Sequence, residues 1–483
     1  MPTLNVAPSA ISTPLTPAIL ERSLKDGLAS GLGWAVMFGA GESSFPLFAA
    51  MIQAPDYFFG LLFGVPCLLG PLLQVWGANV LERIRNCRLL VLYSVAVQII
   101  SFIPLIVLPF LDPGLLLYAI FCLAVLCYYL TGHFAYPSWT AWISTLTPTE
   151  RHADYFARFS RGVATFSLIS KLFVGAALFW AGQCPVETRG RSLALVLAIA
   201  FAVAGIARGF SFWHLKRMYE LPYEHTPDAT FTFWQFIRRV RESNFVRFVF
   251  YIGFFNFGLF LSAPFFVPYV LYELHFAQWQ WVVMDSMAVL ATILALLYWG
   301  RFIARFGNKK TLKYTTYGMA LIPLFWICSG NYYYLIIINF IAGAAWAGFV
   351  LSSYNYILEA ATPAKRARCV AYTSIFAGVG SFVGSMVGAW LNQVLPPAEW
   401  SVVTTSNFAY LLIASGVMRI MAGLFFLPMF RELRNVQPLS LTQYFFTLPI
   451  FASWYGCDSG SSSASSADDC CQARPTTTQT ESK

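Results

Sequence analysis

The chain has 483 residues, 58% of them hydrophobic and 11% charged, with a formal net charge of +9. Soluble globular proteins carry roughly 25% charged residues, so a soluble fold could not cover this much apolar surface. The positive residues fall mainly in loops beside apolar segments, so the net charge does not indicate a nucleic-acid-binding protein.

Apolar runs of about 20 residues, the length of a helix that crosses a bilayer, recur along the whole chain. Lipid offers the backbone no hydrogen-bond partners, and the runs are continuous rather than alternating, so they predict helices. In chain order, the twelve predicted spans are 27–53, 58–80, 89–111, 114–136, 160–182, 191–214, 246–271, 279–303, 311–330, 332–355, 370–395 and 406–430.

The loops between these spans differ in charge. Arg189 and Arg191 fall on one side of the membrane, whereas most Lys and Arg residues outside the spans fall on the other side. Positively charged loops stay in the cytoplasm during membrane insertion, so this side is predicted to be cytoplasmic. With an even number of spans, both termini then lie in the cytoplasm.

Four short patterns occur twice in the same chain order, at offsets of 211 to 223 residues. The pairs are Pro46 and Pro264, Trp76-Gly77 and Trp299-Gly300, Thr147-Pro148-x-x-Arg151 and Thr362-Pro363-x-x-Arg366, and Gly205-x-x-Arg208 and Gly416-x-x-Arg419. A parallel repeat of half the chain, in so apolar a sequence, is typical of two-bundle transporters with a site between the halves.

The repeat and the composition predict five segments. They are a cytoplasmic N-terminal segment (1–26), a six-helix bundle (27–215), a cytoplasmic linker (216–245), a second six-helix bundle (246–435) and a cytoplasmic tail (436–483). The tail begins with a short apolar segment, predicted to lie at the membrane interface, and continues as a Ser- and Thr-rich stretch that is predicted to be disordered.

A basic turn joins the second and third spans of each half. Its glycines allow a sharp reversal, and its arginines can bond helix C-termini or acids on neighbouring helices. This turn resembles the loop motif of the major facilitator superfamily: Gly, three residues, Asp-Arg, any residue, Gly and a basic pair. The second copy matches at Gly300, Arg305, Gly307 and Lys309, with Ala304 in place of the acid, and the first copy keeps Gly77, Glu82 and Arg83.

The resemblance covers roughly residues 20–435 and implies an all-α membrane protein, with twelve transmembrane helices in two parallel-repeat six-helix bundles. It also implies a secondary-active permease in which the residues of the basic turn act in gating. Arg151 and Arg366, in the second repeated loop, are minor candidates for the same role. Gly41-Glu42, Tyr155-Phe156 and Pro264-Phe265-Phe266 resemble a prokaryotic branch, which implies a bacterial inner membrane.

Five charged residues lie well inside the predicted spans, more than five residues from either end. A charge at a helix centre costs about 2.5–3.5 kcal/mol on insertion scales, so each must face protein or water. Glu42 lies mid-span among small residues with Pro46 just beyond, where a local break in the helix is expected. Its carboxylate could carry a proton, bind a cationic group or pair with a base such as Lys171.

The other intramembrane charges differ in their expected roles. Lys171 and Asp285 are candidates for substrate or proton binding. Arg208 and Arg419 occupy equivalent places in the repeat, on the last helix of each half, and are predicted to be structural. By the resemblance, the first and fourth helices of each half line the central cavity, which adds Trp139, Trp142, Asn256, Trp346, Tyr354 and Asn355 as lining candidates.

The preferred function is a permease that moves a small solute by alternating access. We expect it to act as a monomer in the lipid bilayer, with protons as a candidate coupling ion, and without nucleic acid, cofactor or metal. Two alternatives stay open at this point: a membrane-embedded enzyme of the transferase type, and a transporter-like sensor that binds its ligand without moving it.

Overall fold

The computed structural model describes residues 16–148, 151–220, 243–360, 366–399, 403 and 406–433. These belong to one compact unit, Met1–Asn435, whereas the second unit, Val436–Lys483, lies outside the described residues. Most of the predicted linker (221–242) and the repeated Thr362-Pro363 loop also lie outside them. The predicted boundaries of the five segments therefore stay predictions.

The first half of the chain is helical from residue 17 to residue 217, apart from short connections. Its elements are α1 (Pro17–Ala40), η1 (Glu42–Ser44), α2 (Phe45–Met51), α3 (Asp56–Ile84), α4 (Cys87–Val107), η2 (Leu108–Phe110), α5 (Leu115–Leu146), α6 (His152–Gly182) and α7 (Val186–Arg217). The first predicted span corresponds to α1, η1 and α2 together, and each of the other five contains one long helix.

The second half repeats this pattern. Its elements are α9 (Asn244–Phe260), η5 (Ala263–Phe265), α10 (Phe266–Pro268), η6 (Tyr269–Glu273), α11 (Gln278–Phe306), α12 (Asn308–Trp326), α13 (Tyr332–Ala360), α14 (Arg366–Val394), α15 (Phe408–Phe426) and η8 (Leu427–Met429). No strand occurs among the described residues. The prediction of an all-α, two-bundle membrane fold is confirmed.

Ten helical segments of the described chain are long and apolar enough to cross a membrane. The two remaining predicted spans form α1–α2 and α12, which contain more polar residues. In α12 the polar face is buried against protein: Thr311, Thr315 and Thr316 are almost fully inaccessible. The hydroxyl of Thr315 donates to the carbonyl of Thr311 at 2.9 Å, so the helix satisfies this group itself.

Helix α1 begins ten residues earlier than predicted. Thr16 caps it by accepting a hydrogen bond from the amide of Ile19. Asp26 belongs to the predicted cytoplasmic segment (1–26), but it is buried in the bundle, where its carboxylate contacts His214 Nδ1 on α7 at 2.6 Å. This pair lets a charged residue lie within the helical bundle.

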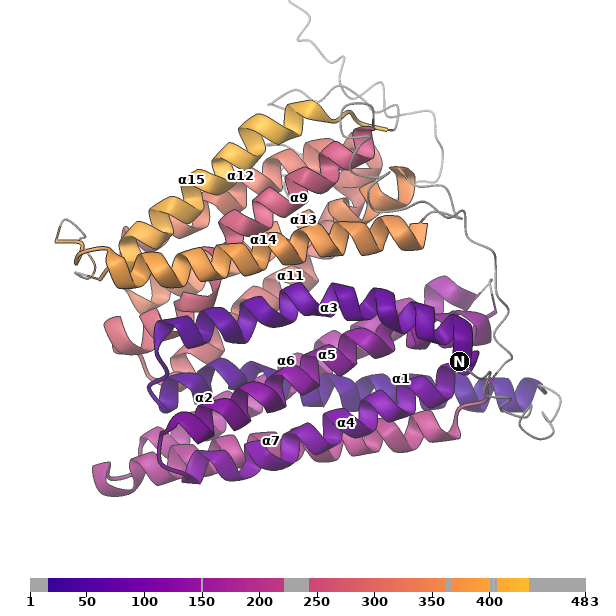
Figure 1. Cartoon of the computed structure of the whole chain (residues 1–483), viewed down its shortest axis with the longest axis horizontal. Coiled ribbons are helices and arrows are strands. Elements are labelled where there is room, and N and C mark those ends of the chain that lie inside the picture. Colours follow the sequence, from indigo (N-terminus) through magenta and orange to yellow (C-terminus); the bar gives the residue numbers. More distant parts are fainter. Residues whose placement is uncertain are drawn as a thin grey trace, which may run out of the picture. The chain divides into compact units, whose positions relative to one another are not determined.

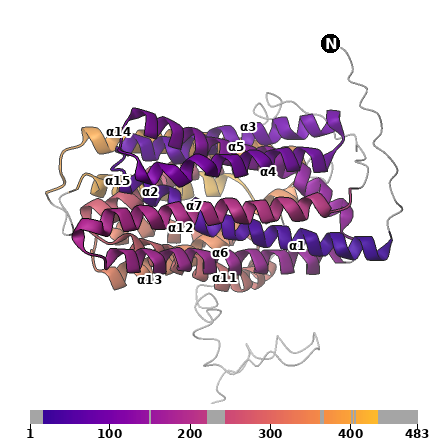
Figure 2. The ribbon, with the colours of Figure 1, turned by 90° about the horizontal axis from the view of Figure 1, so that it is seen from below.

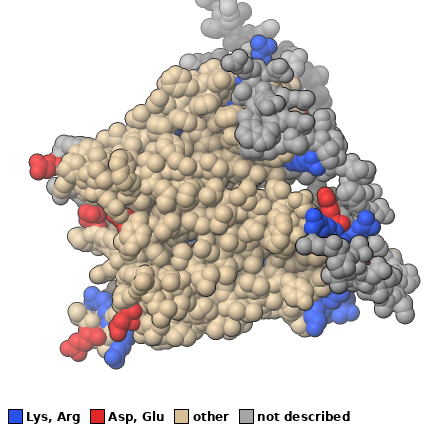
Figure 3. All heavy atoms as spheres, in the orientation of Figure 1, with Lys and Arg blue, Asp and Glu red and all other residues tan. Residues whose placement is uncertain are grey.

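The helices of both halves run roughly alongside one another (Figures 1 and 2). The halves meet where α3 packs on α14 and where α6 packs on α11. Charged residues gather at the two ends of the visible face, and the surface between them carries few Lys, Arg, Asp or Glu residues (Figure 3). We call the end that carries Arg83, Arg88, Arg217 and Arg305 the basic end, and the other end the opposite end.

Three turns at the basic end show how the chain leaves its helices, and the one at Gly307 confirms the predicted glycine reversal. Helix α5 extends to Leu146, ten residues beyond the predicted span 114–136, and Thr147 is then extended (φ −88°, ψ 124°), as is usual for a residue before proline. Between α11 and α12 the chain reverses at Gly307, where φ is 87°, a conformation that favours glycine. In the first half, Arg85 takes the left-handed turn conformation at φ 55°.

The segment that follows α7 is held against the first bundle by several hydrogen bonds. The amide of Tyr219 donates to Ser23 Oγ at 3.0 Å, and the indole N–H of Trp142 donates to the Tyr219 carbonyl at 2.8 Å. The amide of Arg88 donates to Glu220 Oε1 at 3.3 Å. Burial raises the pKa of the Glu220 carboxyl, and its contacts with Arg88 partly oppose this shift.

Helix α14 approaches α9 through a row of glycines spaced four residues apart: Gly380, Gly384 and Gly388. A Cβ atom on Gly384 would lie 2.4 Å from the carbonyl oxygen of Phe257, and the other two face backbone carbonyls of the α9 segment just as closely. Small residues at this spacing let two membrane helices pack backbone to backbone. The second bundle therefore depends on the absence of side chains along this row.

We expect Gly384→Leu to destabilise the protein by about 1–3 kcal/mol or more, because the backbone of α9 cannot move aside as a flexible side chain could. Thermal unfolding of the purified protein in detergent measures this effect. Gly209→Leu is the matched control, since a Cβ at Gly209 has no atom within 4 Å. Equal melting temperatures for the two variants would contradict the packing argument.

Candidate functional site

The first helical span is interrupted at Glu42, as predicted. Helix α1 ends at Ala40, and Glu42–Ser44 form one turn of 3-10 helix before α2 begins at Phe45. Ser43 and Ser44 return their hydroxyl hydrogen bonds to the carbonyls of Gly39 and Ala40. The side chain of Glu42 is half-buried and lines a cavity.

A chain of hydrogen bonds connects Glu42 to Arg208 through two neutral residues. The hydroxyl of Tyr128 donates to Glu42 Oε2 at 2.6 Å. Gln98 Nε2 donates to the Tyr128 carbonyl at 3.0 Å, and Gln98 Oε1 accepts from Arg208 Nε at 2.8 Å. Arg208 Nη1 also donates to Ser211 Oγ at 3.1 Å. The first bundle thus holds an acid and a base in one network, separated by neutral groups.

This network borders a cavity of about 610 Å³, within the size range typical of small-molecule sites. Most of its lining comes from the first bundle, and Tyr354, Val370 and Ser374 come from the second. Its aromatic wall includes Trp34, Tyr128, Tyr129, Tyr136, Trp139 and Phe159. We call it the central cavity.

The central cavity extends toward the basic end, because Val91, Leu215 and Val370, all within a turn or so of helix ends there, line it. At the opposite end the two halves are joined. Asn392 Nδ2 donates to Asp56 Oδ2 at 2.7 Å, and the hydroxyl of Tyr272 donates to the Ala50 carbonyl at 2.7 Å. The described conformation is therefore closed by contacts between the halves at the opposite end.

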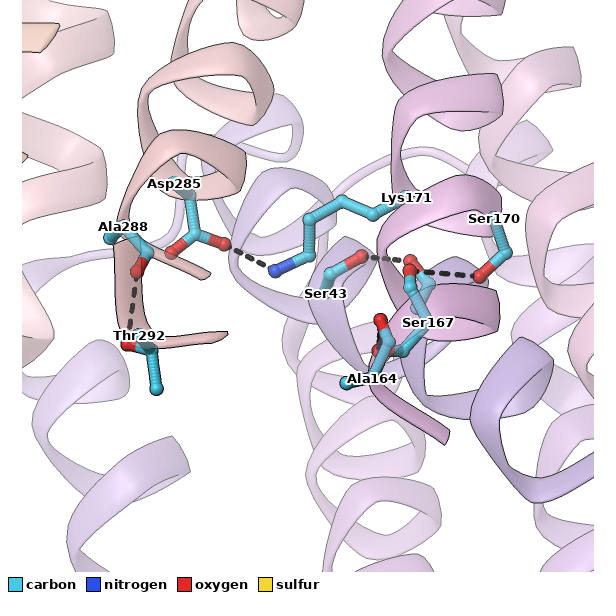
Figure 4. Close-up of polar contacts among 9 residues, drawn as sticks. Ser43, Ala164, Ser167, Ser170, Lys171, Asp285, Ala288 and Thr292 are labelled. Atoms are coloured by element: carbon cyan, nitrogen blue, oxygen red, sulfur yellow. Dashed lines mark hydrogen bonds and ion pairs between the residues drawn. The ribbon is translucent and has the colours of Figure 1, made fainter. Parts of the chain in front are cut away.

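A third contact between the halves is an ion pair (Figure 4). Lys171 on α6 reaches Asp285 on α11, with Nζ 2.5 Å from Oδ2. The side chain of Lys171 is 8% exposed and that of Asp285 38% exposed. The sequence suggested Glu42 as the partner of Lys171, but the structure pairs Lys171 with Asp285 instead.

Arg419 lies in the second bundle beside a smaller cavity of about 360 Å³. Its guanidinium donates to the Met319 carbonyl at 2.8 Å, the Leu259 carbonyl at 3.4 Å and Ser262 Oγ at 3.3 Å. Asp285 and Trp346 also line this second cavity. The two arginines of the repeat thus have different acceptors, mainly backbone for Arg419 and side chains only for Arg208.

The remaining lining candidates divide into two groups. Trp139 and Tyr354 line the central cavity. Trp142 is 2% exposed and holds the segment after α7, while Asn256 donates to the Ile252 carbonyl of its own helix at 2.8 Å. Asn355 and these two residues are not part of the lining of either cavity.

The gating candidates lie at the basic end, largely exposed. Glu82, Arg83 and Arg151 are exposed, and none of them forms an ion pair with another described residue. Gly77 packs against the Phe134 carbonyl on α5, and Gly300 has open space around it. The remaining charged candidates are Arg305, Lys309 and Arg366.

Arg305 lies over the ring of Phe306, with its guanidinium carbon 5.2 Å from the ring centroid. The amide of Lys309 donates to Glu432 Oε2 at 2.7 Å, and its ammonium lies 5.7 Å from the centroid of Phe430. The side chain of Arg366 lies outside the described residues. The gating roles of all these residues stay predictions.

Sequence reasoning missed Gln98, Tyr128 and Tyr129, which border the central cavity together with His133. A signal was present for Gln98, because a glutamine within a long apolar run needs a polar partner. The tyrosines gave no such signal, since aromatic residues are frequent throughout this chain.

The fold is that of a polytopic membrane protein, with a solute-sized cavity lined by residues of both helical bundles. Residues 244–457, in the second half of the chain, match the family model of the Major Facilitator Superfamily. Among curated proteins, none matches the sequence.

Solved structures show the same fold over most of the chain. A bacterial homologue of the human lysosomal transporter Spinster, in an inward-facing and unoccupied conformation, has 15% identity and a TM-score of 0.60, covering 87% of this chain and 98% of its own. The nucleoside transporter NupG has 12% identity and a TM-score of 0.57, and the match covers 86% of this chain and 99% of NupG. The POT family transporter PepTSo has 10% identity and a TM-score of 0.64, and the match covers 86% of this chain and 98% of PepTSo.

Proposed function

We propose that the protein is a secondary-active permease that carries a small solute through the central cavity by alternating access, coupled to protons through Glu42. The observation that carries this proposal is a solute-sized cavity that extends to the basic end, is lined by charged residues, and is closed at the opposite end by contacts between the halves.

The distribution of charge supports an orientation with the basic end in the cytoplasm, because positive residues concentrate there. In this orientation the described conformation faces inward. Transport then requires the contacts Asp56–Asn392, Ala50–Tyr272 and Lys171–Asp285 to break as the opposite end opens.

Glu42 is the preferred proton carrier because it lies at a break in a membrane helix and is reached from the cavity. The titratable and charged groups that face it are Tyr128 and Tyr129 on α5 and Lys171 on α6, with Arg208 on α7 at the far end of the hydrogen-bond network. Lys171 already contacts Asp285, so the Glu42 carboxyl can exchange a proton without breaking an ion pair of its own.

The proposal is tested in liposomes that contain the purified protein and a trapped pH-sensitive dye. Pools of small metabolites are added outside, and solute-dependent proton movement is measured against empty liposomes. Proton movement that depends on one solute supports a proton-coupled permease. Chemical turnover of a lipid or solute would favour the transferase-type enzyme, and saturable binding without flux would favour a sensor.

A further inference from the structure

The central cavity contains two opposite charges that do not neutralise each other. Glu42 accepts from the Tyr128 hydroxyl, and Arg208 donates to Gln98 and Ser211, all of which are neutral. Neither Glu42 nor Arg208 forms an ion pair with another described residue. Both residues line the same cavity.

Building on the proposed permease function, we infer that the transported solute is zwitterionic, which we call dipolar below. Its cationic group binds at Glu42, its anionic group binds at Arg208, and an apolar or aromatic body lies between them. A simple cation or anion would compensate only one of the two charges. Because Gln98 and Tyr128 separate Glu42 from Arg208, the solute must carry its own charges apart.

Arg208 has the geometry for an anionic group. The residue is 8% exposed, and the hydrogen bonds within the described chain use Nε and Nη1, leaving Nη2 to donate to a ligand. A guanidinium edge binds carboxylate and phosphate oxygens through charge-assisted hydrogen bonds, which are roughly twice as strong as neutral ones.

Glu42 has the geometry for a cationic group. Its Oε2 atom accepts one hydrogen bond from Tyr128, and carboxylate oxygens have further lone pairs for an ammonium. Tyr129, Trp34 and Trp139 line the same cavity, and aromatic faces attract organic cations. The aromatic wall also accommodates the body of the solute between its two charged ends.

The second half has no counterpart of the Glu42–Arg208 arrangement, so the two separated charges are not a general consequence of the repeated fold. The offset of 218 residues between Pro46 and Pro264 places Phe260, an uncharged residue, opposite Glu42. Arg419 donates to the backbone carbonyls of Met319 and Leu259. The pair of uncompensated charges therefore belongs to the first bundle alone among the two copies of the repeat.

The inference is tested by binding of three probes with one aromatic body: para-(aminoethyl)benzoate, which is dipolar, para-methylphenethylamine, a cation, and para-ethylbenzoate, an anion. Affinity is measured on the full-length protein in detergent by thermal shift and calorimetry. We expect the dipolar probe to bind at least about tenfold more tightly than either monopolar probe, because it alone makes both charged contacts. Equal affinities, or no binding of the dipolar probe at millimolar concentration, overturn the inference.

Two variants test the anion-binding Arg208 and the cation-binding Glu42 separately. Arg208→Gln should remove the advantage of the dipolar probe over the cation, and Glu42→Gln should remove its advantage over the anion. Arg301→Gln on the exposed face of α11 is the charge-matched control and should preserve both preferences. If Arg208→Gln fails to fold, Glu42→Gln alone decides, because retention of both preferences in it contradicts the inference. Solute-dependent proton flux with no preference for dipolar probes would leave the permease function standing and overturn only the solute class.

Discussion

Proton movement driven by the transported solute should fall to the level of empty liposomes in Glu42→Gln. The glutamine keeps the size of the side chain and can still accept the hydrogen bond from Tyr128, but it cannot take up or release a proton. Exchange of labelled for unlabelled solute, which needs no net proton movement, should persist when the solute concentration is high enough to saturate the weakened site. Comparing proton flux with solute exchange in the same preparation measures this difference.

Glu187→Gln is the matched control, because Glu187 is an exposed acid in the first turn of α7. It should retain full proton flux. Unaltered proton flux and pH dependence in Glu42→Gln would show that another group carries the proton. Loss of both flux and exchange would instead assign Glu42 to solute binding alone, without a separate coupling role.

Replacement of Asp285 should be among the most destabilising changes in the interface between the halves. In Asp285→Asn, the ammonium of Lys171 stays nearly buried without its partner, and breaking a buried ion pair in this way costs about 3–5 kcal/mol. Asp285 is partly exposed, so solvent reduces the effect toward the lower end of this range. The expected result is a clear fall in melting temperature in detergent.

A double-mutant cycle separates the ion pair from general damage. Lys171→Met combined with Asp285→Asn should regain much of the lost stability, because no charge is left unpaired. The exposed pair Arg158–Asp154, at 2.7 Å, provides the control, and Asp154→Asn should cost less than about 1 kcal/mol. Additive losses in the double variant would contradict an energetic coupling between Lys171 and Asp285.

Much of the fold could be predicted because the bilayer imposes simple rules. Continuous apolar runs predicted the helices, and the repeat predicted two bundles. The break at Glu42 was also predictable, since small residues and a proline surround a charge in the middle of a span. These features depend on local sequence and on the solvent, both of which can be evaluated without tertiary contacts.

The candidate site was harder to predict from the sequence, because it depends on which faces of the helices meet. Helix α5 is apolar on all sides, so no periodicity distinguishes the cavity-lining Tyr128 from a lipid-facing residue. Lys171 and Asp285 are 114 residues apart, and their pairing depends on how the two halves meet. The sequence therefore predicted Lys171 as an intramembrane charge but could not identify its partner.

The two repeated arginines differ in how easily substitution can change their surroundings. A main-chain carbonyl persists whichever amino acid carries it, so Arg419 keeps its acceptors at Met319 and Leu259 through almost any substitution there. Arg208 depends on the side chains of Gln98 and Ser211, and a single codon change at either one removes an acceptor. We therefore expect changes in solute preference to arise mainly from substitutions in the first bundle, while the surroundings of Arg419 in the second bundle stay the same.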